Sequence, residues 1–273
     1  MKQLRKSELI VNNDGSVYHL GLKPEHLYDT VITVGDPDRV EEVTKYLDTI
    51  DYTIQNREFR TVGGTKDGKQ LMVMSTGIGT DNIDIVFNEL AFLANYDLQT
   101  RTPHAQKRKL SIVRLGTSGS MASHLPLGII VYSKYAISMD DLFFYYKHSF
   151  DTVSFADTQF PVIACSEQLA TLFSHYAPSL TLTAKGFYGP QFRNAQISPK
   201  YELAEVQQME YKQMHVGNIE METAGIYGMA ALLGFEAISI NALLANRLVG
   251  HFSENPQAIV ERMIKESLEI LCK

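Results

Sequence analysis

Short apolar runs that end in glycine-rich segments alternate with amphipathic stretches, and this alternation is what most constrains the fold of the chain. Strands are predicted over residues 31–35, 71–75, 110–115, 128–132, 160–164 and 237–244. Helices are predicted from residue 37 to about 47, from 80 to about 93, and over 223–233 and 258–271. Strands and helices that alternate in this way are typical of an α/β fold. No linker rich in proline, glycine and serine divides them, so the sequence predicts a single domain over residues 1–273.

Composition excludes several classes of protein. Hydrophobic residues make up 45% of the chain and charged residues 21%, which is typical of a folded globular protein. The formal net charge of −6 argues against binding to nucleic acid, because such proteins usually present a basic surface. No run of about 18 apolar residues occurs, so we expect no membrane span. Cys165 and Cys272 are too few for a disulfide framework, which favours a reducing, cytoplasmic location.

Residues 95–109 interrupt the alternation of elements. The segment is polar and contains the basic residues Arg101, Lys107, Arg108 and Lys109. A solvated surface insertion is the favoured interpretation. A nucleic-acid contact is the alternative, which the salt dependence of binding would test.

Glycines lie at or just after the ends of three of the predicted strands, at Gly35, at Gly77 and Gly79, and at Gly116 and Gly119. We expect turns at these glycines, since ligands of open α/β sheets bind beyond the carboxyl ends of strands and glycine lets backbone N–H groups approach an anion. Arg39 and Arg114 lie near two of the turns. Arginine, a hydroxyl and exposed amides together favour phosphate, although each arginine taken singly also fits an ordinary solvated charge.

At these segments the chain resembles the bacterial uridine phosphorylases of the nucleoside phosphorylase superfamily. The resemblance extends from about Tyr18 to the C-terminal helix, and Gly-Asp-Pro-Asp-Arg and Glu-Met-Glu are its most specific segments. The matching segments are Val17-Tyr18-His19-Leu20-Gly21-Leu22, Gly35-Asp36-Pro37-Asp38-Arg39-Val40, Arg57-Glu58-Phe59, Ser75-Thr76-Gly77-Ile78-Gly79, Arg114-Leu115-Gly116-Thr117 and Asn218-Ile219-Glu220-Met221-Glu222.

The resemblance implies a single α/β domain with a mixed, distorted β-barrel-like sheet flanked by helices. It also implies a homodimer, or a hexamer built as a trimer of dimers, with active sites completed across the dimer interface. The phosphate site implied by the resemblance comprises Gly35, Arg39, Arg114 and Thr117, with Arg57 from the neighbouring subunit.

For the ribose, the resemblance implies that Met221 lies against the sugar and that Glu222 accepts hydrogen bonds from its 2′ and 3′ hydroxyls. Glu220 would lie nearby, and His19 of the neighbouring subunit would contact the 5′-hydroxyl. Without the resemblance, Glu220 and Glu222 equally fit an acidic pair at a helix start, and His19 fits a structural role.

The base site implied by the resemblance comprises Phe187, Gln191, Arg193 and Arg247. An aromatic ring packs on the base, Gln191 both donates to and accepts from the uracil edge, and Arg193 donates to a carbonyl oxygen. Arg247 would support Arg193. Purine phosphorylases of this superfamily usually carry an aspartate where Asn246-Arg247 stands here, which favours a pyrimidine.

The implied activity is the reversible phosphorolysis of uridine in pyrimidine salvage, with inorganic phosphate as co-substrate and no organic cofactor. Other readings stay open: a phosphorylase acting on deoxyuridine, thymidine or a purine nucleoside, a hydrolytic nucleosidase, or a non-catalytic nucleoside-binding protein. Related proteins hold a monovalent cation, such as potassium, at positions matching Glu58, Ile78 and Asn82. Thr80-Asp81-Asn82 and Lys185-Gly186 depart from the family pattern, so cation binding and the effect of Lys185 stay open.

Overall fold

The computed structural model describes residues 3–273, which form two compact units. Unit 1 contains the described residues up to Val113 together with Met229–Glu236 and Cys272–Lys273. Unit 2 contains Arg114–Gly228 and Ala237–Leu271. The single domain over residues 1–273 remains a prediction.

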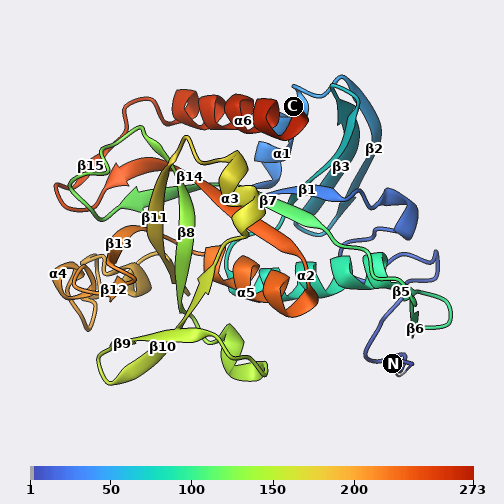
Figure 1. Ribbon diagram of the computed structural model, residues 1–273, viewed down its shortest axis with the longest axis horizontal. Helices are drawn as coiled ribbons and strands as arrows, with labels where there is room; N and C mark the ends of the chain where they lie inside the picture. The colour runs from blue at the N-terminus through green and yellow to red at the C-terminus, as the bar shows by residue number, and fades with distance from the viewer. Residues whose placement is uncertain (1–2) are drawn as a thin grey trace. The chain divides into compact units, whose positions relative to one another are not determined.

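Unit 1 contains a four-stranded sheet in the order β1-β4-β3-β2, in which β1 and β4 are parallel and the other pairs are antiparallel. The β2–β3 hairpin is at the right of Figure 1. The elements of this unit are η1 (Pro24–His26), β1 (Thr30–Val34), α1 (Pro37–Thr44), β2 (Thr49–Asn56), β3 (Phe59–Lys66), β4 (Lys69–Ser75), α2 (Thr80–Asn95), β5 (Tyr96–Asp97) and β6 (Thr102–Pro103).

Local chemistry explains the first helix. The Asp36 side chain accepts a hydrogen bond from the Asp38 N–H at 3.0 Å, and Pro37 occupies the first helical position. The helix ends at Thr44, earlier than the predicted residue 47, because the Tyr46 and Leu47 N–H groups bond to carbonyls only three residues back.

Unit 2 is built around a closed five-stranded barrel. Its strands follow the order β13-β11-β8-β14-β7, and β7 pairs back with β13 to close it. The β8–β11 and β11–β13 pairs are parallel, whereas β14–β8 and β13–β7 are antiparallel. The five strands are β7 (Ser111–Ser120), which begins in unit 1, β8 (Ile130–Met139), β11 (Ala177–Ala184), β13 (Met214–Glu220) and β14 (Glu236–Asn246). The predicted α/β class with a mixed, barrel-like sheet flanked by helices is confirmed.

Further elements surround the barrel strands. Strands β9 and β10 form a hairpin, visible at the bottom of Figure 1, and β10 also pairs with β8. The remaining elements are η2 (Leu142–Tyr145), β9 (Asp151–Phe155), β10 (Thr158–Ala164), α3 (Glu167–Leu172), η3 (Gly189–Gln191), α4 (Leu203–Val206), β12 (Glu210–Tyr211), α5 (Thr223–Leu233), β15 (His251–Phe252) and α6 (Pro256–Cys272).

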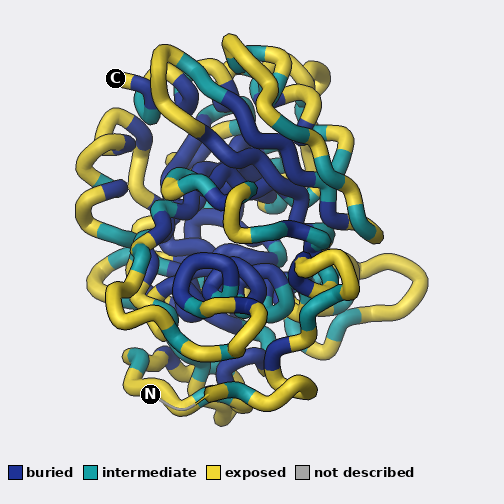
Figure 2. Tube along the Cα trace, turned by 90° about the vertical axis from the view of Figure 1, so that its right-hand side faces the viewer, coloured by how far each residue is buried: buried dark blue, intermediate teal, exposed yellow. Residues whose placement is uncertain are grey.

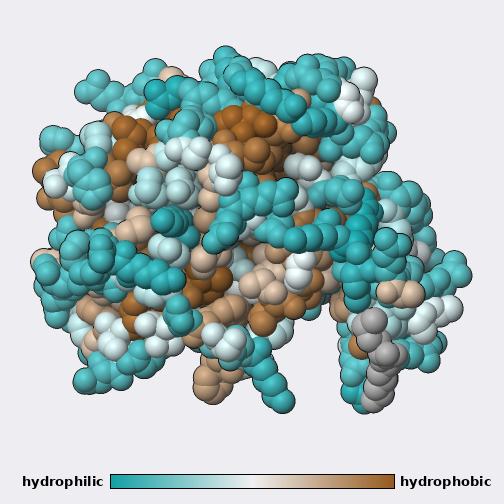
Figure 3. Space-filling model, viewed as in Figure 1, coloured by the Kyte–Doolittle hydropathy of each residue, from teal (hydrophilic) through white to brown (hydrophobic). Residues whose placement is uncertain are grey.

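The five barrel strands and β1, β3 and β4 consist mostly of buried residues, and Figure 2 shows buried and exposed stretches along the chain. In unit 2, a cluster of buried side chains includes Ile137, Leu180, Leu182, Val216 and Ile219. Hydrophilic residues predominate on the face shown in Figure 3, with smaller apolar patches between them. Burying the apolar side chains of the unit 2 cluster stabilises the fold by about 25 cal/mol per Å² of apolar surface removed from water. Burial of this kind is the main source of stability.

The prediction of a turn at residues 116–119 is wrong. Strand β7 continues through Gly116 and Gly119 to Ser120, and Gly119 and Ser120 pair with β13. The glycines are needed for space rather than for a turn. A Cβ at Gly116 would lie 1.8 Å from Arg114 Nη1, and one at Gly119 would lie 3.0 Å from Arg247 Cγ.

The segment 95–109 is part of unit 1 and makes several contacts within it. Its strands β5 and β6 pair with each other, and the Asn95 side chain accepts a hydrogen bond from the Arg108 N–H at 2.8 Å. Arg108 donates to Asp29 at 2.5 Å, and Lys109 forms an ion pair with Glu236. Two of the four basic side chains are therefore paired with acidic ones, which weakens the case for nucleic-acid binding. Within residues 3–273 no helix has the length and apolar character needed to span a membrane.

Candidate active site

The ends of β1 and β4 lie side by side in unit 1. The two strands are parallel, and the Thr76 N–H donates to the Val34 carbonyl at 2.8 Å just beyond their last paired residues. A Cβ at Gly35 would lie 3.5 Å from the Gly77 carbonyl oxygen. The two glycine segments therefore lie side by side. Arg39 lies in the first turn of α1, with Nε 3.9 Å from Glu42 Oε2.

Arg57 and His19 lie close together on the surface of unit 1. Arg57 is exposed at the β2–β3 turn, where it adopts a φ of 54°, and its guanidinium lies 5.3 Å from the centre of the Tyr18 ring. The Tyr18 ring meets the His19 ring edge-on, with centroids 4.8 Å apart. The two residues that the resemblance assigns to a neighbouring subunit therefore share one surface.

The buried carboxylate of Glu89, on α2, holds His19 in place. It accepts hydrogen bonds from the backbone N–H groups of His19 and Leu20 at 2.8–3.0 Å. His19 Nδ1 lies 2.7 Å from Glu89 Oε1. Because a carboxylate is an acceptor, this contact places a proton on Nδ1, and in the neutral form of the ring Nε2 is then the acceptor.

Arg114 lies in unit 2, buried between two carboxylates. Its Nη2 donates to Glu222 Oε2 at 2.6 Å and lies 3.0 Å from Glu220 Oε2. Its Nη1 donates to Asn241 Oδ1 at 2.8 Å and to Ser239 Oγ at 3.3 Å. Burial lowers the pKa of Arg114, but the two carboxylates outweigh it and raise the pKa above its usual value. The side chain stays charged.

The carboxylate of Glu220 is hydrogen-bonded to other groups of the protein. Its oxygens accept hydrogen bonds from the N–H groups of Glu222 and Thr223, at the start of α5, and from the Thr183 hydroxyl. These donors and Arg114 satisfy the carboxylate, as expected of an acidic residue at a helix start. Met221 and Glu222 follow directly. Thr117 is half-buried on β7, three residues after Arg114.

The predicted base residues come together in unit 2. Arg193 Nη1 donates to Gln191 Oε1 at 2.6 Å and to the Phe187 carbonyl. The Arg193 guanidinium lies 3.6 Å from the centre of the Phe187 ring, which is half exposed. Arg247 Nη2 donates to the Gln191 carbonyl at 3.0 Å. Burial and the neighbouring Arg247 lower the pKa of Arg193 to about 10.

One guanidinium nitrogen of this group has an unmet donor. Arg247 Nη1 is buried and has no hydrogen-bond partner within residues 3–273. A buried donor without an acceptor costs about 1–3 kcal/mol, so an acceptor supplied by a ligand is favoured at this position.

The positions expected at the monovalent cation site lie around Gly77 in unit 1. A Cβ at Gly77 would lie 2.3 Å from Asn82 Nδ2 and 3.5 Å from Glu58 Cγ, and Ile78 is the next residue. Their carboxylate, amide and carbonyl oxygens are the hard donors that such a cation prefers. In unit 2, Lys185 departs from the family pattern, and its side chain donates to Asp141 at 2.6 Å. The two side chains form an ion pair.

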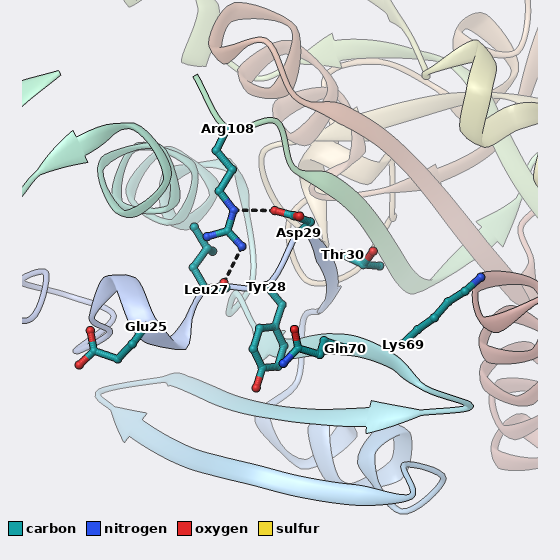
Figure 4. A pocket seen from close by; sticks show the side chains of 8 residues that line it. All are labelled: Glu25, Leu27, Tyr28, Asp29, Thr30, Lys69, Gln70 and Arg108. Carbon is teal, nitrogen blue, oxygen red and sulfur yellow. Dashed lines mark hydrogen bonds and ion pairs between the residues drawn. The ribbon is translucent and has the colours of Figure 1, made fainter. Parts of the chain in front are cut away.

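An open polar pocket of about 530 Å³ also lies in unit 1 (Figure 4), and none of the predicted site residues lines it. Its lining includes Arg108, whose bonds to Asp29 and to the Leu27 carbonyl are dashed in Figure 4. Both acidic and basic side chains line the pocket, so it has no single charge preference.

Comparison with known families decides the classification of the chain. Residues 29–273 match the family model described as the phosphorylase superfamily. The chain belongs to the phosphorylase superfamily. The match covers the predicted phosphate and base residues and Glu222, and it leaves His19 outside.

Individual members of the phosphorylase superfamily agree with this assignment. Uridine phosphorylase of Thermococcus kodakarensis is 25% identical over 261 residues, covering 95% of this chain and 88% of that protein. Uridine phosphorylase of Escherichia coli is 29% identical over 241 residues, covering 85% of this chain and 86% of that protein. A purine nucleoside phosphorylase of Bacillus velezensis is 24% identical over 255 residues, covering 92% of this chain and 97% of that protein.

Among solved structures, a Trypanosoma brucei nucleoside phosphorylase, described as showing uridine phosphorylase activity, has a TM-score of 0.88 to this chain. The two are 26% identical, and the alignment covers 96% of this chain and 99% of that one. This likeness supports the predicted fold of the superfamily independently of the sequence motifs.

Three residues of the site were not predicted from the sequence. Asn241 and Ser239 contact Arg114 from β14, and Glu89 contacts His19 from α2. Each is 70 or more residues away from its partner along the chain. Polar residues within the apolar patterns of β14 and α2 were the only available sign.

Proposed function

We propose that the chain is a uridine phosphorylase, which cleaves uridine reversibly with inorganic phosphate to uracil and ribose 1-phosphate. Among the substrates of the superfamily, uridine is favoured by the side chains of Gln191, Arg193 and Arg247. Gln191 can donate and accept, which matches the N3–H and carbonyl edge of uracil. The unmet Nη1 donor of Arg247 suits a carbonyl oxygen of the base.

The phosphate is bound by arginine side chains and backbone amides. Arg39 and Arg114 supply charge, and Arg57 comes from the neighbouring subunit. Gly35 lets the backbone approach the anion, and Thr117 donates its hydroxyl. Charge-assisted contacts of this kind contribute about 1.5–3 kcal/mol each, enough to hold the dianion beside the sugar.

The ribose lies on Met221 with its 2′ and 3′ hydroxyls donating to Glu222, while Glu220 orients Arg114 and the start of α5. His19 of the neighbouring subunit accepts a hydrogen bond from the 5′-hydroxyl through Nε2. The Glu89 contact, which places the proton on Nδ1, supports this role.

The reaction follows from these positions. The C1′–N1 bond breaks, and its electron pair passes to the uracil ring while the ribose gains positive charge. A phosphate oxygen bonds to C1′ from the opposite face, and the proton of HPO₄²⁻ passes to uracil. Gln191 and the two arginines of the base site stabilise the negative charge that develops on the leaving base. Binding phosphate and nucleoside together raises their effective concentration.

The active unit we propose is a homodimer, alone or within a trimer of dimers, located in the cytoplasm. The common surface of Arg57 and His19 supports it, because one contact would deliver both side chains to a partner's site. Glu58, Ile78 and Asn82 would hold a monovalent cation such as potassium at this interface, where the ion would neutralise charge and stabilise the dimer.

A purine nucleoside phosphorylase is the second candidate, since such enzymes are among the relatives. The two are separated by measuring kcat/KM for uridine, 2′-deoxyuridine, thymidine and inosine in saturating phosphate. We expect a pyrimidine nucleoside to exceed inosine by at least about 100-fold, because a site built to hydrogen-bond the uracil edge leaves its polar groups unpaired with a purine. Equal or higher turnover of inosine would reject the pyrimidine assignment.

A further inference from the structure

A ring of hydrogen bonds between buried polar side chains runs around the five barrel strands of unit 2. Ser118 on β7 accepts from Asn218 on β13, and Asn218 accepts from Thr181 on β11. Thr181 bonds to Ser133 on β8, and Ser133 accepts from Asn241 on β14. Asn241 in turn accepts from Arg114, which returns the ring to β7.

Every member of this ring is at most 8% exposed. Burying so many polar groups costs free energy unless each finds a partner, and a fully satisfied network fixes the side chains in one arrangement. Such a ring therefore favours one conformation of its side chains, including that of Arg114.

Asn241 is the member that connects this ring to the candidate site. Its Nδ2 donates to Ser133 Oγ at 3.0 Å and to Ser239 Oγ at 3.1 Å. Its Oδ1 accepts from Arg114 Nη1 at 2.8 Å. An arginine offers only donors, so the amide oxygen must face Arg114, and the amide cannot flip without losing these contacts.

The two terminal nitrogens of the Arg114 guanidinium are thus held by different side chains. Glu220 and Glu222 hold Nη2, while Asn241 and Ser239 hold Nη1. Gly116 leaves the space that the guanidinium fills, because a Cβ there would lie 2.3 Å from Arg114 Cζ.

The charge of the acceptor at Nη1 also matters. Two carboxylates already face Nη2 and offset the positive charge of Arg114. A third carboxylate at Nη1 would leave less attraction for a dianion, whereas an amide oxygen orients the guanidinium at no cost in charge.

We propose that Asn241 is a positioning residue for phosphate binding, which fixes the plane of the Arg114 guanidinium through a neutral hydrogen bond anchored in the buried ring. The inference rests on the proposed function, in which Arg114 binds phosphate. Asn241 itself touches no substrate.

The test compares Asn241→Leu with Asn218→Leu. Both asparagines are fully buried members of the ring, but only Asn241 contacts Arg114. We expect Asn241→Leu to raise the KM for phosphate by about 10- to 100-fold and to leave the KM for uridine within about twofold. Asn218→Leu breaks the ring away from Arg114, so it lowers the melting temperature and raises the KM for phosphate less than Asn241→Leu does. Equal phosphate KM values for the two variants would overturn the proposal.

Asn241→Asp keeps the size of the side chain and serves if Asn241→Leu does not fold. It retains an acceptor for Arg114 and adds negative charge, so the KM for phosphate rises by at least about tenfold. A phosphate KM unchanged from wild type in this variant would also contradict the proposal.

A crystal structure of an Asn241 variant separates this inference from the proposed function. If the wild type cleaves no uridine with phosphate, the proposed function is wrong, whereas the orientation of Arg114 can still be compared. A guanidinium rotated away from its wild-type plane supports the positioning role, and an unmoved one overturns it.

Discussion

The Arg114 guanidinium donates to the Glu222 carboxylate at 2.6 Å, with both side chains about 7% exposed. By the proposed roles, one member of this pair binds phosphate and the other binds ribose. The phosphate and sugar subsites therefore share a buried ion pair. Removing one partner of such a pair costs about 3–5 kcal/mol of stability, so substitutions that leave both charges in place test the site more cleanly.

Gly116→Ala should impair phosphate use without removing any charged group. The added Cβ would lie 1.8 Å from Arg114 Nη1, so the guanidinium must leave its place and lose its contacts with Asn241 and Ser239. We expect kcat/KM for phosphate to fall by at least about 100-fold. Ser118→Ala, on the same strand, is the control and removes only a hydrogen bond with Asn218. Equal phosphate kinetics in the two variants would count against the assigned position of Arg114.

Mixing two inactive variants should restore activity if Arg57 acts in the partner's site. In a mixed dimer of Arg57→Ala and Arg193→Ala subunits, one site contains an intact Arg193 and the partner's intact Arg57. After random reassociation of equal amounts, half of the dimers are mixed, so activity should recover to about a quarter of the wild-type value. Activity that stays at the level of the separate variants would show that each subunit uses its own Arg57.

Glu89→Gln should affect only substrates that carry a 5′-hydroxyl. Glu89 fixes the proton on His19 Nδ1, and the variant amide also permits the opposite tautomer, in which Nε2 no longer accepts. We expect kcat/KM for uridine to fall about tenfold and that for 5′-deoxyuridine to stay within about twofold. An equal loss for both nucleosides would assign Glu89 a purely structural role.

The thiol of Cys165 should react slowly with alkylating reagents. Burial raises its pKa to about 11, because the thiolate is disfavoured away from water. The thiolate fraction at pH 8 is then about 100-fold below that of an ordinary thiol. In a Cys272→Ser background, the rate of reaction with iodoacetamide should rise about tenfold per pH unit from pH 8 to 10. A rate that levels off below pH 10 would contradict this pKa, and free cysteine in the same buffers is the control.

Short-range sequence patterns were sufficient to predict the elements whose ends depend on neighbouring residues. The strand that became β1, the helix start at Asp36-Pro37 and the C-terminal helix follow from short-range signals and were predicted within a few residues. Strand β8 was placed two residues early and several residues short, because its polar positions Ser133 and Ser138 break the apolar run.

Long-range contacts decide what the sequence could not predict. Gly116 and Gly119 suggested a turn, since the sequence does not show that Arg114 folds back over Gly116 or that the distant Arg247 packs on Gly119. The bond between Arg114 and Asn241 joins residues 127 positions apart. The candidate site residues came from motif resemblance, and the structure adds the partners that orient them.

Product analysis with and without phosphate tests the central claim most directly. The protein is incubated with uridine in phosphate-free buffer and in buffer with inorganic phosphate, and uracil and ribose 1-phosphate are measured. We expect uracil only when phosphate is present, with one ribose 1-phosphate formed for each uracil. Uracil released at the same rate without phosphate, together with free ribose, would contradict the account and indicate a hydrolase.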